Sequence, residues 1–242
     1  PLAPPCNGLP APDDPPATIE KPLNTFQVEN PEETRRPYRD LLFSATGLGQ
    51  YIGGVILYDE TLRQKSADGT PFAELLSRQG VIPGIKVDAG AKDMALCPGE
   101  TVTEGLDGLA KRCAEYVMLG AKFAKWRAVI TIGPSIPSQA CITANAHALA
   151  RYAAICQAAG LVPIVEPEVL MDGDHTIERC DEVTEWTLRE QFAALASQRV
   201  ALEKMVLKPS MVVAGASCRQ QAPVNEVAER TLKVLKRTVP AA

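Results

Sequence analysis

Short apolar runs alternate with longer amphipathic stretches along most of the chain. The apolar runs predict strands, and the stretches between them predict helices. The predicted strands cover residues 51–58, 81–88, 123–130, 161–168 and 202–211. The predicted helices cover residues 71–79, 106–119, 138–159, 175–198 and 225–237, with another starting at Asn30 and a long loop over 90–103. Alternation of near-continuous apolar strands with helices is typical of a parallel sheet covered by helices.

Charged residues recur where these predicted strands end. They are Lys86 and Asp88, Lys125 and Arg127, Glu166 and Glu168, and Lys208. Within each pair the spacing of two places both side chains on the same face of a strand. The strand ends of a (β/α)8 barrel converge on one mouth, whereas an open sheet would spread them along an edge. The chain contains neither a GxGxxG nor a GxxxxGK[ST] loop, so the pattern favours an α/β barrel of the TIM type.

The lysine in the last predicted strand is the main candidate for chemistry. Met205, Val206 and Leu207 form an apolar run that ends at Lys208, and Pro209 follows. An ammonium group is costly to bury, so a lysine held there should lose its proton near neutral pH and attack carbonyl groups. The alternative is a lysine whose amine reaches solvent from the strand end. The other charged pairs could equally be structural salt bridges.

Composition limits the remaining classes of function. The chain has 242 residues, a net charge of −4 and no apolar run of membrane-spanning length, so neither a nucleic-acid nor a membrane partner is expected. The cysteines number seven and are scattered, with only His147 and His175 to join them, so we expect free thiols in a reducing cytosol and no metal site. Proline crowds residues 1–29, which predicts an extended or disordered arm.

A series of motifs makes the chain similar to a known family. They are GIKVD at 84–88, GLDG at 105–108, FAKWR at 123–127, LARY at 149–152, VPIVEPE at 162–168, DGDH at 172–175 and LKPSM at 207–211. Together they closely resemble class I fructose-1,6-bisphosphate aldolase from about Asn30 to the C-terminus. The resemblance implies a TIM barrel that cleaves fructose 1,6-bisphosphate without a cofactor, in a cytoplasmic homotetramer of glycolysis.

The resemblance also implies catalytic roles for five residues. Lys208 matches the lysine that forms a Schiff base with the C2 ketone, and Glu166 matches the glutamate that transfers protons to it. Glu168 matches a second acid that orients the first. Lys125 matches a lysine that stabilises charge near the reacting centre, and Asp13 aligns with the aspartate that takes the C4 hydroxyl proton.

Three further residues match positions around the substrate. Lys86 matches a lysine on the phosphate side, Arg127 lies beside Lys125, and Thr18 keeps a hydroxyl near a family serine. We therefore expect these three residues to contact the phosphorylated sugar.

The chain departs from the family pattern at both ends. Pro10 and Pro12 stand in the segment that aligns with the first barrel strand, and each would remove a ladder hydrogen bond. The family continues past residue 242, so about six of the eight strand–helix units are expected in a single domain. Such a chain is expected to be unstable or to self-associate. Two alternatives are a catalytically impaired homologue acting as a scaffold, and a Schiff-base enzyme for a smaller carbonyl substrate.

Overall fold

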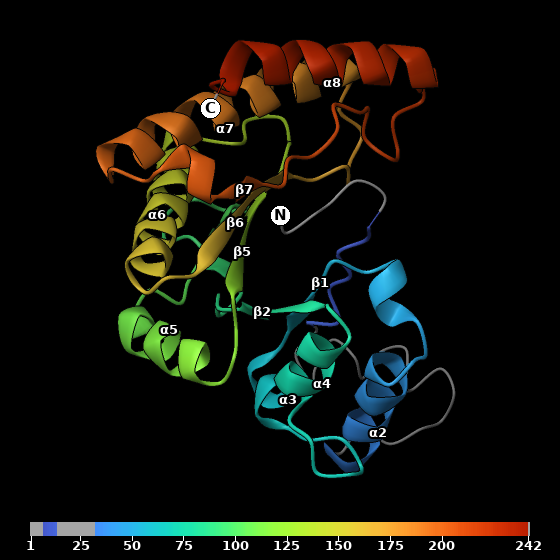
Figure 1. Cartoon of the computed structure of the whole chain (residues 1–242). Coiled ribbons are helices and arrows are strands. Elements are labelled where there is room, and N and C mark those ends of the chain that lie inside the picture. Colours follow the sequence, from blue (N-terminus) through green and yellow to red (C-terminus); the bar gives the residue numbers. More distant parts are fainter. Residues whose placement is uncertain (1–6, 14–31, 242) are drawn as a thin grey trace. The chain divides into compact units, whose positions relative to one another are not determined.

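The computed structural model describes residues 7–13 and 32–241. The main sheet has the strand order β1-β2-β5-β6-β7, and helices follow its strands along the chain (Figure 1). The predicted parallel α/β fold is therefore confirmed. By internal contacts the chain divides into two compact units, which are described in turn. The first contains the described residues up to Val87 together with 110–125 and 159–161, and the second contains the rest.

Three parallel strands form the sheet of the first unit. They are β1 (Gly54–Leu57), β2 (Ile82–Lys86) and the opening residues of β5 (Phe123–Ile130). The helices of this unit are α2 (Glu32–Phe43), α3 (Asp59–Arg63), α4 (Phe72–Arg78) and most of α5 (Leu109–Met118), with a 3-10 turn η1 (Leu48–Gln50).

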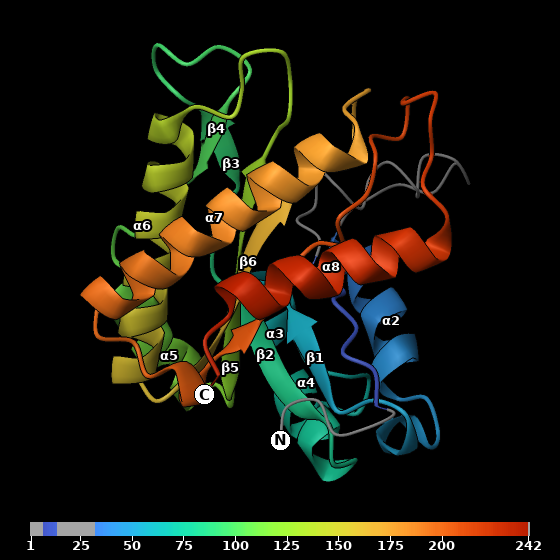
Figure 2. The ribbon, with the colours of Figure 1, turned by 90° about the horizontal axis from the view of Figure 1, so that it is seen from above.

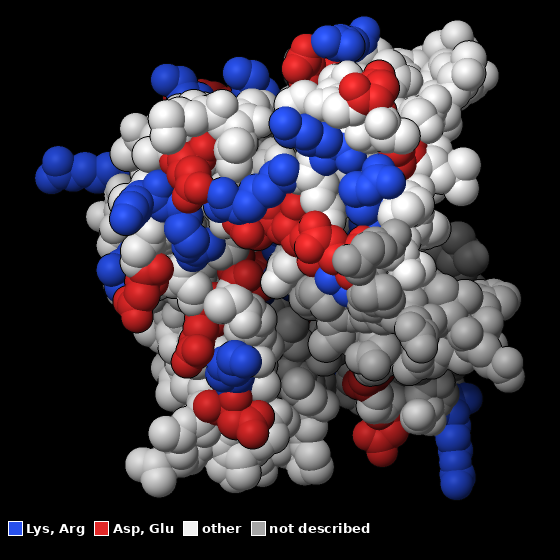
Figure 3. Space-filling model, turned by 90° about the horizontal axis from the view of Figure 1, so that it is seen from below, with Lys and Arg blue, Asp and Glu red and all other residues white. Residues whose placement is uncertain are grey.

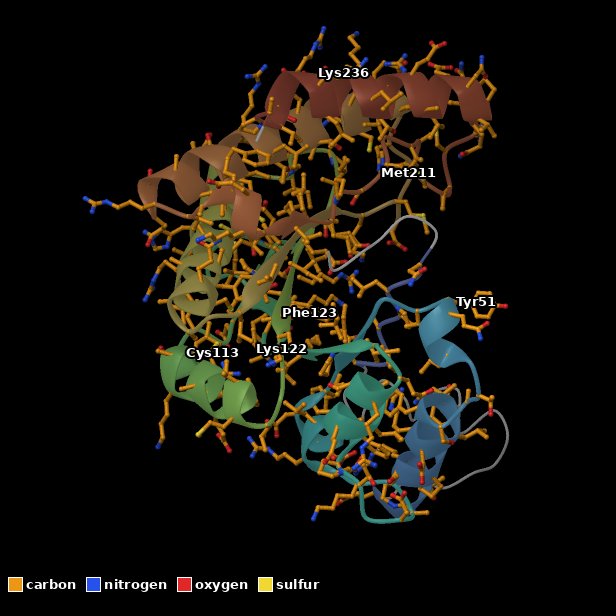
Figure 4. All side chains as sticks on the ribbon, viewed as in Figure 1. Tyr51, Cys113, Lys122, Phe123, Met211 and Lys236 are labelled. Carbon is orange, nitrogen blue, oxygen red and sulfur yellow. The ribbon has the colours of Figure 1, made fainter. Side chains whose placement is uncertain are left out.

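A glycine allows β2 to pack beside β5. A Cβ atom at Gly84 would lie 2.3 Å from the ring of Phe123, which is fully buried and is labelled in Figure 4. All four residues of β1 are buried as well, and the rings of Phe43 and Phe72 meet edge to face at 5.2 Å. Apolar burial of this kind is the main stabilising term of the unit.

Residues 7–13 run beside β1 without forming a regular strand. Gly8 makes a parallel bridge with Ile52, and its carbonyl accepts from Gly53 at 3.0 Å. The next bond joins the Ile56 amide to the carbonyl of Pro10 at 3.1 Å. The two acceptors are therefore two residues apart in sequence, whereas their donors, Gly53 and Ile56, are three residues apart. Pro10 has no N–H and cannot donate a ladder bond, as the sequence predicted, and the register shifts by one residue at this point.

The second unit holds the remainder of β5 together with β6 (Val162–Val169) and β7 (Val206–Leu207), which pair in parallel with each other. Its helices are α6 (Gln139–Ala158), α7 (Ile177–Ser197) and α8 (Val224–Thr238), and it also contains the hairpin strands β3 (Ala91–Asp93) and β4 (Thr101–Thr103) and the 3-10 turn η2 (Leu202–Lys204). Helix α8 lies along α7 in both ribbon views (Figures 1 and 2).

The helices of the second unit cover its strands with an apolar layer. Trp126 of β5 packs against Tyr152 of α6 with ring centroids 5.5 Å apart, and both side chains are fully buried. The Tyr152 hydroxyl donates to the carbonyl of Ile164 in β6 at 3.1 Å. The side chain of Thr176 caps α7 by accepting from the Arg179 amide. Packing and capping therefore fix α6 and α7 against the strands that carry the charged residues.

Two element predictions are wrong. The region 90–103, predicted to be one long loop, contains the antiparallel hairpin β3–β4, whose exposed outer residues carry no apolar alternation. The strand predicted over 202–211 shrinks to Val206–Leu207, with η2 before it. Two prolines limit the hydrogen-bond ladder between β6 and β7, because neither has an N–H to donate. Pro209 follows β7, and Pro167 lies in β6.

The described surface mixes charges of both signs. In the face shown in Figure 3, Lys and Arg side chains are interspersed with Asp and Glu. Within residues 7–13 and 32–241, no helix is long and apolar enough to cross a membrane.

One buried amide side chain ties the hairpin to α6, beside which β4 lies in Figure 2. Asn145 donates to the carbonyl of Thr101 at 2.8 Å and accepts from the amide of Thr103 at 3.2 Å. Since its side chain is only 2% exposed, no water can replace these bonds freely.

Replacing Asn145 by alanine should therefore destabilise the protein by about 2 kcal/mol, because a buried carbonyl and a buried amide lose their partner. Thr143→Ala, an exposed change on the same helix, should cost less than about 0.5 kcal/mol. Urea unfolding at equilibrium measures both. Equal effects of the two variants would contradict the role of Asn145.

Candidate active site

The first unit places three of the predicted site residues in one electrostatic group. The Lys125 amine donates to a carboxylate oxygen of Asp13 at 3.0 Å, and the side chains of this pair are only 10% and 9% exposed. Lys86 lies near enough to act on the charge of Asp13. Asp13 and Lys125 are 112 residues apart in sequence. They meet because residues 7–13 run beside β1, and Lys125 is the last residue of β5 that pairs with β2.

Burial raises the pKa of the Asp13 carboxyl above 3.8, although the charges of Lys125 and Lys86 and the hydrogen bond from Lys125 oppose the rise. A raised pKa means that the folded protein holds this proton more tightly than the unfolded chain does. The contribution of Asp13 to stability is therefore most favourable at low pH and is lost as the pH rises through the folded-state pKa. An acid of this kind is suited to accepting a proton from a substrate.

The second unit pairs the lysine of β7 with a glutamate of β6. Val165 is in register with Leu207, so the next residues on each strand, Glu166 and Lys208, project to the same side. The Lys208 amine donates to a carboxylate oxygen of Glu166 in a short contact. This arrangement can pass a proton between the amine and the carboxylate.

The prediction that Lys208 is buried is wrong. Its side chain is 57% exposed, whereas that of Glu166 is 3% exposed. Because β7 ends at Leu207 and Pro209 follows, Lys208 lies at the very end of the ladder and its stem reaches solvent. The glutamate, not an apolar pocket, sets the environment of the amine.

A second ion pair stands beside the first. The Arg127 guanidinium donates to Glu168 in another short contact, with both side chains half-buried. The Arg127 amide also donates to Asp88, whose other carboxylate oxygen accepts from the amide of Gly90 at 3.0 Å. The predicted charged residues Arg127, Glu168 and Asp88 are therefore held in place by specific hydrogen bonds and an ion pair.

The side chains of the two ion pairs, Lys208–Glu166 and Arg127–Glu168, line a cavity of about 440 Å³ in the second unit. Its lining residues are Arg127, Glu166, Glu168, Val169, Leu170, Met171, Asp172, Lys208, Pro209, Ser210, Met211 and Val213. The polar groups are two cations, three acids and a serine, and the thioethers of Met171 and Met211 are largely exposed at the cavity. Figure 4 shows Met211 on the segment between β7 and α8. Such a cavity can hold a small polar molecule, which the charged groups of both signs would orient.

The structure thus gathers the predicted residues into two groups, one in each unit. Asp13, Lys125 and Lys86 form the first, and Lys208, Glu166, Glu168 and Arg127 form the second. Thr18, predicted to contact substrate, lies outside the described residues. No role was predicted for Met171, Asp172, Ser210 or Met211, although Asp172 lies in the motif at 172–175, Met171 precedes it, and the other two lie in the motif at 207–211.

A parallel α/β sheet with lysines and carboxylates at its strand ends is typical of a TIM-barrel-type enzyme. Comparison with known families identifies which one. The model of the glycolytic fructose-bisphosphate aldolase class-I family matches residues 1–242. The chain therefore belongs to the class-I fructose-bisphosphate aldolases, a family of carbon–carbon lyases.

Curated relatives agree with this assignment. The chain is 60% identical to the probable fructose-bisphosphate aldolase class 1 of Xanthomonas campestris pv. campestris, over 98% of this chain and 71% of that protein. It is 53% identical to fructose-bisphosphate aldolase 1 of Toxoplasma gondii, over 100% of this chain and 67% of that protein. Cytosolic fructose-bisphosphate aldolase 6 of Arabidopsis thaliana is 52% identical, over 98% of this chain and 66% of that protein.

A solved structure supports the fold. The fructose-bisphosphate aldolase of Plasmodium falciparum, crystallised with TRAP and a small-molecule inhibitor, matches with a TM-score of 0.96 and 46% identity. The match covers 99% of this chain and 70% of that one. The predicted TIM-barrel type of fold, present in part, is thereby confirmed.

The buried pair of Asp13 and Lys125 allows a test of coupling. Asp13→Asn should destabilise the protein by about 3 kcal/mol at pH 7, because it removes the negative charge that contacts the buried ammonium of Lys125. The double variant with Lys125→Met should cost clearly less than the sum of the two single changes. Urea unfolding of all four proteins measures the coupling, and strict additivity would show that the pair does not interact.

The pKa of Asp13 allows a second test. In a carbon-detected NMR titration its carboxyl should show a midpoint above 3.8, and Lys125→Met should raise that midpoint further because an opposing charge is removed. Asp68 serves as the internal control, since hydrogen bonds from Ser66 and Thr70 lower its pKa to about 2 and it should not respond to the change at Lys125. A midpoint for Asp13 at or below 3.8 would show that the charges of Lys125 and Lys86 outweigh its burial, contrary to the expected direction.

Proposed function

We propose that the chain cleaves fructose 1,6-bisphosphate into dihydroxyacetone phosphate and glyceraldehyde 3-phosphate through an imine at Lys208. The observation that carries the proposal is the contact between the Lys208 amine and Glu166. An amine attacks a carbonyl only when it is uncharged, and a carboxylate in direct contact can take its proton. Family membership supplies the substrate class, and Arg127, which lines the same cavity as Lys208, suits a phosphate of that substrate.

In the proposed first stage Glu166 accepts a proton from the Lys208 ammonium. The free amine adds to C2 of the ketone, and the resulting carbinolamine oxygen leaves as water with a proton from the Glu166 carboxyl. A protonated imine remains, which can accept an electron pair. The burial of Glu166 keeps bulk water from competing for this proton.

In the second stage the Asp13 carboxylate takes the proton of the C4 hydroxyl. The C3–C4 bond breaks, glyceraldehyde 3-phosphate departs, and the electron pair moves into the imine to give an enamine. Protonation at C3 and addition of water to C2 then release dihydroxyacetone phosphate and restore the amine. Lys125, which contacts Asp13, would hold the carboxylate ionised for this step by its positive charge.

The proposal extends to the cellular compartment in which the protein works. The relative from Arabidopsis thaliana is named cytosolic, and the free cysteines among the described residues, including four buried ones, suit a reducing compartment. We place the chain in the cytosol on this basis.

Borohydride reduction in the presence of dihydroxyacetone phosphate tests the imine. Mass spectrometry should find the reduced adduct on Lys208, and Lys208→Met should lower labelling at least about a hundredfold because the variant lacks the amine that contacts Glu166. Lys204→Met, an exposed lysine on η2, is the matched control and should label like the parent chain.

Labelling that survives in Lys208→Met would assign the imine to another lysine. If the parent chain is not labelled at all, the imine mechanism fails. Binding of the bisphosphate without labelling would then favour the alternative of a non-catalytic binding protein.

A further inference from the structure

The ladder between β6 and β7 stops just where the proposed reactive lysine stands. In a parallel pair, alternate residues of a strand direct both N–H and C=O to the same neighbour. On β6 these residues are Val165, Pro167 and Val169. The carbonyl of Val165 accepts from the Lys208 amide at 2.9 Å, as a regular ladder requires. Pro167 has no N–H, so the next ladder bond, to the carbonyl of Lys208, cannot form.

Side-chain hydroxyls take the place of the ladder bonds beyond this point. In a continued ladder the Val169 amide would donate to the main-chain carbonyl of Ser210, but it donates to the Ser210 hydroxyl at 3.1 Å. The Val212 amide donates to the hydroxyl of Thr231 in α8 at 3.0 Å. That hydroxyl in turn donates to the carbonyl of Val227 at 2.6 Å.

Lys208 therefore stands between two attachments to β6. On one side is its own amide bond to Val165, and two residues later is the hydroxyl of Ser210. Since β7 contributes only two residues and Pro209 cannot donate, this hydroxyl holds the segment after Lys208 to the strand that carries Glu166. Ser210 is also part of the cavity lining, so it lies at the site.

We propose that Ser210 is a positioning residue, whose hydroxyl fixes the main chain of Lys208 relative to the strand of Glu166. The proposal rests on the proposed function of Lys208. A loose segment would let the exposed lysine stem move away from the carboxylate. Small displacements of a reacting group reduce rates strongly while leaving substrate binding largely intact.

The experiment compares Ser210→Ala, which removes the acceptor, with Ser210→Thr, which keeps it. Ser197→Ala is the matched control, because the Ser197 hydroxyl bonds a carbonyl within α7 at 3.0 Å far along the chain from the site. Two quantities are measured: the rate of borohydride trapping with dihydroxyacetone phosphate as a function of its concentration, and hydrogen exchange of the Val169 amide.

Ser210→Ala should slow trapping about tenfold or more at saturation with the half-saturating concentration within about twofold. Exchange at Val169 should become about tenfold faster, because its acceptor is lost. Ser210→Thr should retain at least about half of the parent trapping rate, and Ser197→Ala should match the parent chain in both measurements. Parent-like trapping in Ser210→Ala, or an equal loss in the alanine and threonine variants, would overturn the proposal.

The outcome separates the two proposals. If the parent chain is not trapped, the proposed function fails. A second measurement then reports the contact with Glu166: the ratio of the acylation rates of Lys208 and Lys204 with acetic anhydride. The positioning role stands if Ser210→Ala, and not Ser210→Thr, changes that ratio about threefold or more. It falls if the ratio is the same in all three proteins.

Discussion

The parallel register of β6 and β7 is the constraint on which the candidate site depends. Pairing Val165 with Leu207 makes Glu166 and Lys208 neighbours on one side of the sheet. A slip of one residue would turn one of the two side chains to the opposite face. The register is held by few main-chain bonds, because β7 has two residues, Pro209 follows it, and Pro167 in β6 has no N–H to donate. The helices packed against β6, with the Tyr152 hydroxyl on Ile164, supply the rest of the support.

The two charged groups differ in the physical environment of their acids and amines. Asp13 and Lys125 are both buried, so desolvation raises the pKa of the acid while the ammonium stabilises its charge. Lys208 is exposed, and only its partner Glu166 is buried. The chemistry of this amine therefore follows from a contact with one carboxylate and not from an apolar environment. Such a contact depends on main-chain geometry, which gives the Ser210 hydroxyl its importance.

Much of the fold could be predicted from the pattern of apolar residues. The strand at 123–130 and the helix expected over 138–159 match β5 and α6 closely, because long periodic segments carry strong signals. The hairpin β3–β4 was not predictable in this way, since most of its residues are polar and its support comes from Asn145, 42 residues from Thr103. Charged positions at strand ends could be found from sequence, but not the exposure of Lys208. That depends on where the β6–β7 ladder ends.

A crystal structure of the protein reduced with borohydride in the presence of dihydroxyacetone phosphate tests the central claim most directly. The register of β6 and β7 predicts continuous electron density from the Lys208 amine to C2 of the ligand, with a Glu166 oxygen in hydrogen-bonding distance of the reacting atoms. Density joined to a different lysine, or a Lys208 side chain turned away from Glu166, would contradict the account.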